Sequence, residues 1–223
     1  MISTVPGITA LSKCYNLDGS NPSYSNANQF CALLARDPQG QLQTIGQPFL
    51  NLGGLKTDGI EIQFNWAVRL ADIGAGDGSG RIYLNSGIDW LNHYEIQTLP
   101  GTAFQDFGGT NTIGAPRPDW KALTTFGYRN DRFGMGLRWR FLDAMDDITA
   151  VTTPTTPGLG VSAYHLFDLF GTVEINRSLS LRAGITNLFD RDIPIVSSSQ
   201  TSTDPSTFDI IGRSFSVGAT ITF

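Results

Sequence analysis

Hydrophobic and polar residues alternate strictly along several long stretches of the chain. From Ile60 to Leu70 every second side chain is apolar, and Glu61, Gln63, Asn65 and Arg69 fall between them. Alternate residues of a strand point to opposite faces, whereas a helix would mix the two sets around its surface. The period of two therefore predicts a β-strand with one apolar and one polar face.

Six further stretches repeat this period. The seven expected strands cover residues 60–70, 82–96, 120–128, 133–141, 163–175, 179–185 and 215–223. Strands of soluble sheets average about 5–6 residues, whereas a strand that crosses a membrane needs about 9–11. The lengths favour a transmembrane β-barrel, and a soluble β-sandwich that turns its apolar faces inward is the alternative.

The connections between these strands alternate between short and long. Asn130-Asp131 and residues 176–178 are tight turns, and the Gly- and Asp-rich segment 71–81 is somewhat longer. Three long polar loops cover residues 100–118, 144–160 and 190–209. Short turns at one end and long loops at the other are typical of outer-membrane barrels. The sequence predicts an all-β, antiparallel barrel wall with short periplasmic turns and long extracellular loops.

Composition narrows the choice of protein class. Charged residues are 16% of the chain against a usual fraction of about 25%, and the net charge of −5 argues against a nucleic-acid partner. Aromatic residues at 11% argue against intrinsic disorder. Since no run approaches about 18 apolar residues, a helical membrane protein is excluded.

The faces of the strands follow from the cost of burying charge in lipid. Arg69, Arg138, Arg140 and Arg182 all fall on polar faces. An arginine on the lipid face at mid-membrane costs about 2–4 kcal/mol. We therefore expect the polar faces to line an aqueous lumen and the apolar faces to contact outer-membrane lipid.

Short motifs in a fixed order carry a family resemblance. Asn187-Leu188-Phe189-Asp190 ends one predicted strand, Gly212-Arg213 opens the last strand, and the chain ends on Phe223. Further back stand Gly59-Ile60-Glu61 and Pro118-Asp119-Trp120-Lys121. Together they resemble the C-terminal barrel portion of TonB-dependent outer-membrane receptors, from about Cys14 onward.

The resemblance implies a location in the outer membrane and uptake of a scarce nutrient such as an iron–siderophore. Receptors of this family have a 22-stranded barrel, a plug domain inside it and a TonB-contacting box. About seven strands and no plug sequence indicate a C-terminal segment that is not transport-competent alone. A truncated gene, a split gene or an incomplete gene model would each explain such a segment. Its expected partners are lipid, the barrel assembly machinery, the remainder of the barrel and plug, and TonB only through that missing N-terminal part.

Two regions are expected along the chain. Residues 1–54 would form an extracellular loop region with a short hairpin, and residues 55–223 the C-terminal strands of the barrel. Seven strands leave an open sheet with two edges. A weak alternation over 41–52 could supply an eighth strand, so a small autonomous eight-stranded barrel is a second possible architecture.

Cys14 and Cys31 could form one disulfide or remain two free thiols. A bridge would close a loop of about 18 residues, which contributes roughly 3 kcal/mol in the entropy model. The compartment crossed during export is oxidising, so the bridge is favoured. The segment that holds both cysteines is similar to an extracellular segment of many such receptors.

The final strand carries a candidate assembly signal. Its apolar positions resemble the signal that the outer-membrane assembly machinery reads: Phe215, Val217, Ala219, Ile221 and Phe223. An exposed strand edge can pair its backbone with another strand, while alternate side chains fill pockets. The alternative is an ordinary lipid-facing strand.

Other candidate sites carry little chemistry. Residues 74–80 are Gly-rich but lack the Gly-Lys-Ser/Thr ending of a phosphate loop. His93 and His165 lie on separate strands without further ligands at metal-binding spacing. A calcium site at Asp143, Asp146 and Asp147 is conceivable, but a solvated acidic loop is favoured.

No catalytic arrangement is recognisable. Asp89 and Glu95 lie six residues apart on one strand face, about 20 Å at the rise of a strand, which is too far for a two-carboxylate mechanism. We therefore expect neither enzymatic activity nor a cofactor. The ligand-binding residues are unknown; Phe104, Phe107 and Asn111 are loop residues that could contact a ligand, with nothing to rank them.

Overall fold

The computed structural model describes residues 2–51, 53–75, 78–99, 102–155, 158–196 and 202–222. The chain divides into two compact units, residues 1–55 with 96–105 and residues 56–95 with 106–223. Within the described ranges, no helix is both long and apolar enough to cross a bilayer.

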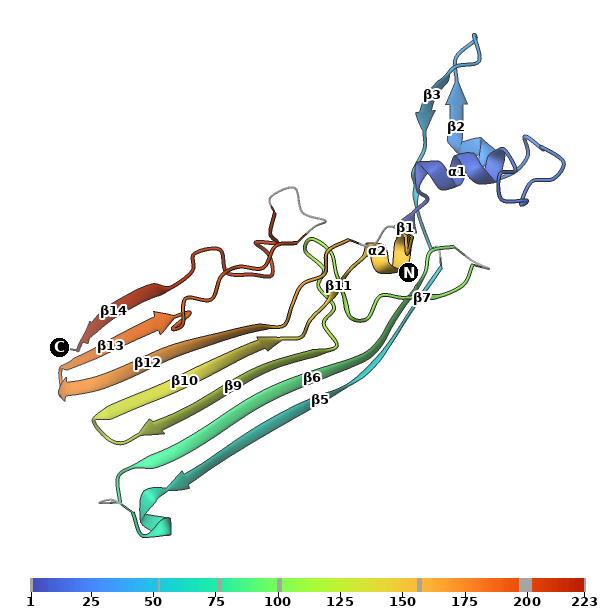
Figure 1. Ribbon diagram of the computed structural model, residues 1–223. Coiled ribbons are helices and arrows are strands. Elements are labelled where there is room, and N and C mark those ends of the chain that lie inside the picture. Colours follow the sequence, from blue (N-terminus) through green and yellow to red (C-terminus); the bar gives the residue numbers. More distant parts are fainter. Residues whose placement is uncertain are drawn as a thin grey trace. The chain divides into compact units, whose positions relative to one another are not determined.

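The larger unit is built on one antiparallel sheet (Figure 1). Seven long strands follow one another in the order β14-β13-β12-β10-β9-β6-β5. Their bounds are β5 Gly54–Arg69, β6 Arg81–Gln97, β9 Trp120–Arg129, β10 Phe133–Leu142, β12 Tyr164–Asn176, β13 Leu179–Thr186 and β14 Ser214–Ile221. The short β7 (Gln105–Asp106) pairs with β6. The prediction of seven long antiparallel strands is confirmed.

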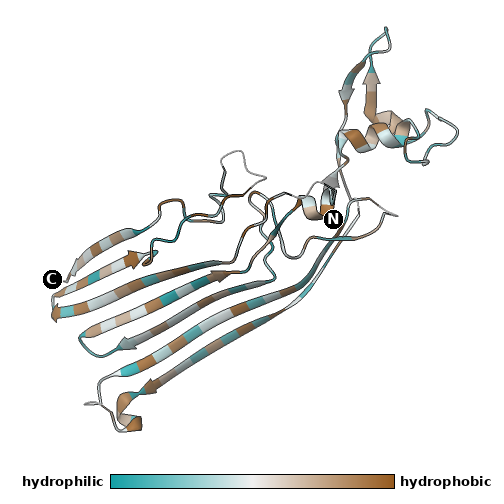
Figure 2. Ribbon diagram, in the orientation of Figure 1, coloured by the Kyte–Doolittle hydropathy of each residue, from teal (hydrophilic) through white to brown (hydrophobic). Residues whose placement is uncertain are grey.

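The register keeps the apolar positions of neighbouring strands side by side. One row runs from Leu84 through Phe126, Leu137 and Leu169 to Ile185. Figure 2 shows the resulting alternation of apolar and polar bands along the strands. A one-residue slip of any strand would move its apolar set to the other face, so the alternation fixes the pairing.

The apolar face is exposed in this chain. Phe64 is 49% exposed, Val217 85% and Ile221 60%, and Leu137 also lies at the surface. A soluble sandwich would bury these side chains between two layers, but the sheet forms a single layer (Figure 1). The sandwich alternative is therefore wrong, because its second apolar layer is not formed by the described residues.

Short connections lie at one end of the sheet and long ones at the other, as predicted (Figure 1). Residues 130–132 and 177–178 join neighbouring strands tightly, and the 3-10 helix η2 (Leu70–Ile73) lies in the β5–β6 turn. The long loops contain β8 (Thr110–Asn111), β11 (Asp146–Asp147) and the short helix α2 (Thr149–Thr152). β8 and β11 pair in parallel, so two of the long loops are joined.

The long loops form a small hydrophobic core of their own. Its buried side chains come from the loops and the start of β12: Met145, Val161, Tyr164, Leu166, Val196 and Phe208. The rings of Tyr164 and Phe208 meet edge to face, 5.2 Å between centroids. Because these residues are far apart in the sequence, the loops depend on one another for their structure.

The smaller unit holds the N-terminal elements. They are β1 (Ile2–Thr4), α1 (Gly7–Cys14), the 3-10 helix η1 (Cys31–Leu33), β2 (Leu34–Arg36), β3 (Leu42–Ile45) and β4 (Phe49–Asn51). A disulfide joins Cys14 and Cys31, whose Cα atoms are 4.8 Å apart. The buried side chain of Asn21 donates to the carbonyl of Cys14 at 2.8 Å.

Two sequence-based expectations about strands need correction. Residues 41–51 do not extend the large sheet, because β3 pairs with β2 and β4 pairs with β1; Leu52 lies outside the described residues. The eight-stranded barrel is therefore not formed by the described part of the chain. In addition, β14 has eight residues, one fewer than expected, and β13 extends one residue further than expected, to Thr186. Asn187, with a positive φ of 53°, turns the backbone out of β13.

Candidate ligand site at the loop end of the sheet

A hollow of about 600 Å³ lies at the end of the sheet that carries the long loops, lined by side chains from both the polar and the apolar positions of the strands. We call it the outer hollow; β5, β6, β9 and the loop before β9 form it. Its charged lining residues are Asp58, Glu61, Asp89, Arg117 and Lys121. A second hollow of about 440 Å³ shares the charged residues Glu61, Asp89 and Lys121 with it, so the two adjoin.

Arg117 is the most distinctive cation of the outer hollow. Its guanidinium stacks over the ring of Tyr94, 4.6 Å from the centroid, and lies 5.9 Å from that of Phe107. Backbone hydrogen bonds between residue 117 and both Gly109 and Thr110 hold this loop segment in place. One guanidinium nitrogen, Nη1, is buried without a hydrogen-bond partner among the described atoms. A buried N–H without a partner favours an anionic ligand group nearby.

The other cations around the hollow are paired. Lys121 Nζ lies 3.4 Å from Asp89 Oδ2. Arg140 holds Asp168 through two hydrogen bonds of 2.9 Å each, from Nε and Nη2. Such fork-like pairs fix both side chains. Among the cations that line the two hollows, Arg117 keeps donor capacity in the described part of the chain.

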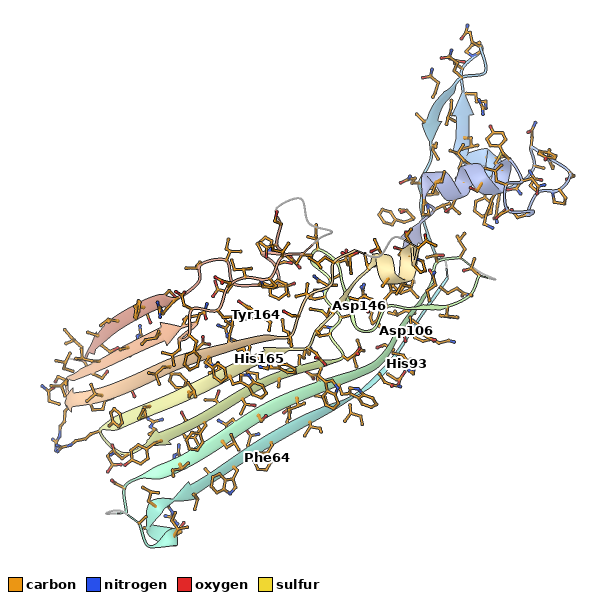
Figure 3. All side chains as sticks on the ribbon, viewed as in Figure 1. Phe64, His93, Asp106, Asp146, Tyr164 and His165 are labelled. Atoms are coloured by element: carbon orange, nitrogen blue, oxygen red, sulfur yellow. A yellow bond between two sulfur atoms is a disulfide. The ribbon has the colours of Figure 1, made fainter. Side chains whose placement is uncertain are left out.

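Four carboxylates gather beside the outer hollow, on the loops. Burial raises the pKa of Asp119, and the negative charges of Asp143, Asp106 and Asp146 raise it further. Figure 3 marks Asp106 and Asp146 at this end of the sheet. Within the described chain no three acidic, His or Cys side chains are placed to hold a metal ion.

The calcium alternative at Asp143, Asp146 and Asp147 finds no support. Asp147 is buried, and its Oδ1 accepts hydrogen bonds from the backbone and hydroxyl of Thr149. Asp143 accepts from the amide of Ala144 instead. Asp143 and Asp147 therefore serve different local contacts rather than one ion.

The two histidines lie on different strands, β6 and β12 (Figure 3). His93 Nδ1 is 3.1 Å from Asp58 Oδ1. His165 is stacked against Trp139, whose indole N–H donates to His165 Nδ1 at 3.2 Å. They do not share a site.

Other sequence candidates are placed as follows. Asp89 and Glu95 are each matched with a lysine, Lys121 at 3.4 Å and Lys56 at 3.8 Å. Phe107 and Asn111 are 6% and 1% exposed, so they belong to the loop interior. Both polar atoms of the Asn111 side chain lack a partner among the described residues.

The apolar positions of β14 lie on one face of the edge strand. Phe215 is 72% exposed, and Ala219 is exposed as well. Val217 and Ile221 share this face, and Phe223 lies outside the described residues. The assembly role of these positions stays a prediction.

The motifs behind the family resemblance have defined structural roles. Asn187 is buried, and its side chain binds both the amide and the carbonyl of Arg191, at 2.8 and 3.0 Å. Asp190 accepts from the amide and the guanidinium of Arg213. Gly212 adopts a positive φ of 75°, which favours glycine. The Asn187–Asp190 and Gly212-Arg213 motifs thus hold the two ends of the last long loop together.

A family model described as "TonB dependent receptor-like, beta-barrel" matches residues 15–188. The chain belongs to this family. TonB-dependent receptors lie in the outer membrane and are transporters rather than enzymes. A search of curated proteins finds no match to the chain.

Two solved receptor structures share the fold. Two structures of variants of the ferric enterobactin receptor PfeA from Pseudomonas aeruginosa superpose with TM-scores of 0.53 and 0.56, at 14% and 15% identity. They match 81% and 85% of this chain, but only 24% and 26% of their own chains. The ferric-catecholate import receptor Fiu from E. coli matches with a TM-score of 0.48 and 17% identity, over 85% of this chain and 23% of its own. The chain spans about a quarter of the length of these receptors.

Sequence reasoning missed Arg117 and its stacking on Tyr94. The ring of Tyr94, near the end of β6, lies beneath the guanidinium of this loop residue. The available signal was the position of Arg117 directly before the Pro118-Asp119-Trp120 motif. Arg117 lies just before the start of β9, so its side chain can reach Tyr94 near the end of the neighbouring strand β6.

Proposed function

We propose that this chain is the C-terminal wall segment of an outer-membrane receptor that takes up a scarce, anionic nutrient such as an iron–siderophore. The observation that carries the proposal is the outer hollow. Its lining combines Arg117, whose guanidinium Nη1 has no partner among the described residues, with the aromatic ring of Tyr94, at the end of the sheet that carries the long loops. A cation with spare donors beside an aromatic ring suits a ligand that carries both negative charge and rings.

The chain acts in this proposal together with further strands. Its sheet has two edges, β5 and β14, in the described part of the chain. Unpaired backbone groups at an edge facing hydrocarbon cost several kcal/mol each, so the edges pair with the remainder of a receptor barrel. A plug would occupy the lumen, and TonB would be contacted only through parts of the receptor outside these 223 residues. The segment alone is not transport-competent.

Two regional roles complete the proposal. Residues 1–54 form an extracellular region held by the Cys14–Cys31 bridge, and residues 55–223 supply barrel strands. The barrel assembly machinery binds the exposed apolar face of β14 during insertion. The apolar face of the whole sheet then contacts lipid.

Binding of a ferric catecholate complex tests the ligand class. The detergent-solubilised chain is dialysed against the iron complex, and bound iron is measured. We expect Arg117→Ala to weaken binding about tenfold, a loss of about 1.4 kcal/mol, with partial rescue by Arg117→Lys. The control Arg132→Ala removes the same charge from a turn at the opposite end of the sheet. Equal binding by all variants would contradict the proposed site.

A further inference from the structure

A hollow of about 410 Å³ lies over β10, β12, β13 and β14. We call it the apolar hollow. Gly171 and Ala183, which lie directly opposite each other in the register, are its smallest lining residues on the apolar face. The next row of the same face holds the large side chains of Leu169, Ile185 and Phe215. Small residues beside a row of large ones leave a depression in the apolar face.

The described side chains do not fill the bottom of the apolar hollow. Within 4 Å, a Cβ placed on Gly171 would meet only the backbone oxygen of Gly134, at 3.3 Å, apart from its own chain neighbours. Ala183 is exposed, and Val217 opposite it is 85% exposed. The lining residues are apolar except for Ser216. The hollow is therefore suited to a hydrocarbon chain rather than to a polar ligand.

A polar ring stands on the same face of the sheet, closer to the long loops (Figure 3). His165, near the start of β12, lies directly opposite Phe141 and is exposed. Its ring is stacked against Trp139, whose indole N–H donates to His165 Nδ1 at 3.2 Å. A neutral imidazole whose Nδ1 accepts carries its proton on Nε2. Since Nε2 makes no hydrogen bond to the described residues, it is an oriented donor for a group outside the chain.

The spacing between His165 and the apolar hollow matches the depth of one lipid leaflet. His165 and Gly171 are six residues apart along β12, about 20 Å at the rise of a strand. A strand tilted by about 45° converts this length into a depth of about 14 Å, close to half of a hydrocarbon core of about 30 Å. Aromatic residues of outer-membrane barrels lie at the membrane interface. With Trp139 and His165 at head-group level, the hollow lies where the acyl chains of the outer leaflet end.

We propose that one phosphate-bearing lipid of the outer leaflet binds at this position. A phosphate oxygen accepts from His165 Nε2, and one acyl chain ends in the apolar hollow. Hydrogen bonds to a charged acceptor are stronger than neutral ones, and a chain that fills the depression gains dispersion contacts that a flat surface does not offer. The inference rests on the proposed lipid contact of the apolar face, and adds one bound lipid to a face that otherwise meets exchanging lipid.

The methionine methyl groups provide a test within the full chain. Met135 lines the apolar hollow, whereas Met145 is buried in the loop core. Their isotope-labelled methyl signals are followed in maltoside detergent while hexadecyl phosphate is added. We expect the Met135 signal to shift and saturate, and the Met145 signal to stay in place. Octyl phosphate, whose chain is too short for the hollow, and hexadecanol, which lacks the phosphate, should each bind at least about tenfold more weakly.

Two variants separate the head group from the chain. His165→Phe keeps a stacked ring but loses the donor, and should weaken binding of hexadecyl phosphate about tenfold without changing that of hexadecanol. Ala183→Phe fills the hollow and should abolish the Met135 shift. The controls His93→Phe and Val68→Phe make comparable changes on β6 and β5, away from the hollow, and should bind as the parent does.

The head-group and chain-length dependence of the parent protein decides the question even if a variant does not fold. The proposal is overturned if the Met135 shift never saturates, if octyl phosphate or hexadecanol binds as tightly as hexadecyl phosphate, or if inorganic phosphate displaces the probe at equal concentration. A Met135 signal that follows protein concentration instead of lipid would identify a second copy of the chain as the occupant, and also overturns it. Tryptophan quenching by brominated lipid, measured in parallel, tests the lipid contact of the whole face, so that failure of the hollow alone is distinguishable.

Discussion

Asp190 and Arg213 are joined across the last long loop, 23 residues apart in sequence. One carboxylate oxygen of Asp190 accepts from the Arg213 amide at 3.3 Å, and the other accepts from the guanidinium at 3.2 Å. The pair connects the end of β13 with the start of β14. Both side chains are about half exposed, so the pair itself contributes less than about 1 kcal/mol and mainly sets the loop geometry.

Asn187 is expected to matter more for this loop than Asp190. Asn187→Ala removes both hydrogen bonds to the backbone of Arg191 and places alanine at a positive φ. Leaving these groups without partners costs about 1–3 kcal/mol. Hydrogen exchange at the amides of residues 188–196 should accelerate strongly in Asn187→Ala, and only slightly in Asp190→Ala. Similar rates in the two variants would contradict the role given to Asn187.

An arginine on the apolar face of β14 should damage insertion more than one on the polar face. Val217 is 85% exposed and lies opposite Ala183 on the apolar face, whereas Thr220 lies opposite Ser180 on the polar face. Arginine on the lipid side costs about 2–4 kcal/mol near mid-membrane. Membrane yield of Val217→Arg should fall well below that of Thr220→Arg. Equal yields would show that the faces are assigned wrongly.

Asp204 makes the extracellular loops sensitive to acid. Burial by itself would raise the pKa of Asp204, but hydrogen bonds from Ser206, Thr207 and the amide of Gly114 outweigh it and leave the pKa below its ordinary value. A lowered folded-state pKa means that its stabilisation is complete above the unfolded value of about 3.9, and is lost as pH falls through the folded value.

The expected result is faster hydrogen exchange in residues 202–213 and around Gly114 as the pH falls below about 4. Asp204→Asn should weaken these loops at neutral pH and remove most of this pH dependence. Asp209→Asn, which changes a carboxylate of the same loop that accepts only from the amide of Ile211, serves as the control. A pH profile in Asp204→Asn that matches the parent would refute this role of Asp204.

The strands could be predicted from the sequence because strict alternation gives each strand one apolar face. Neighbouring strands must then pair in the register that keeps their apolar faces on the same side. β6, β9 and β10 begin and end within one residue of expectation. β5 begins earlier than expected, at Gly54, because Lys56, Thr57 and Asp58 carry no apolar alternation although their backbone pairs. The loop core could not be predicted, since Met145, Val196 and Phe208 meet only through long-range packing.

The bridge between Cys14 and Cys31 should stabilise the N-terminal segment. The two cysteines are 17 residues apart in the sequence. Without the bridge the unfolded chain gains conformational entropy, which lowers the stability of the folded segment by roughly 3 kcal/mol. Reduction, or Cys14→Ser/Cys31→Ser, should make residues 14–31 sensitive to proteases and leave the sheet as resistant as before. Two reactive thiols in unreduced, unfolded protein would show that the cysteines are unpaired.

The most direct test of the outward-facing apolar surface uses the four native tryptophans. Trp66, Trp90, Trp120 and Trp139 all occupy apolar-face positions, and Trp90 stacks on Trp120 with 5.8 Å between ring centroids. Fluorescence of the protein reconstituted in vesicles is measured with brominated lipids and, separately, with aqueous iodide. Strong quenching by brominated lipid and weak quenching by iodide is the predicted result; the reverse order would contradict a lipid-facing apolar surface.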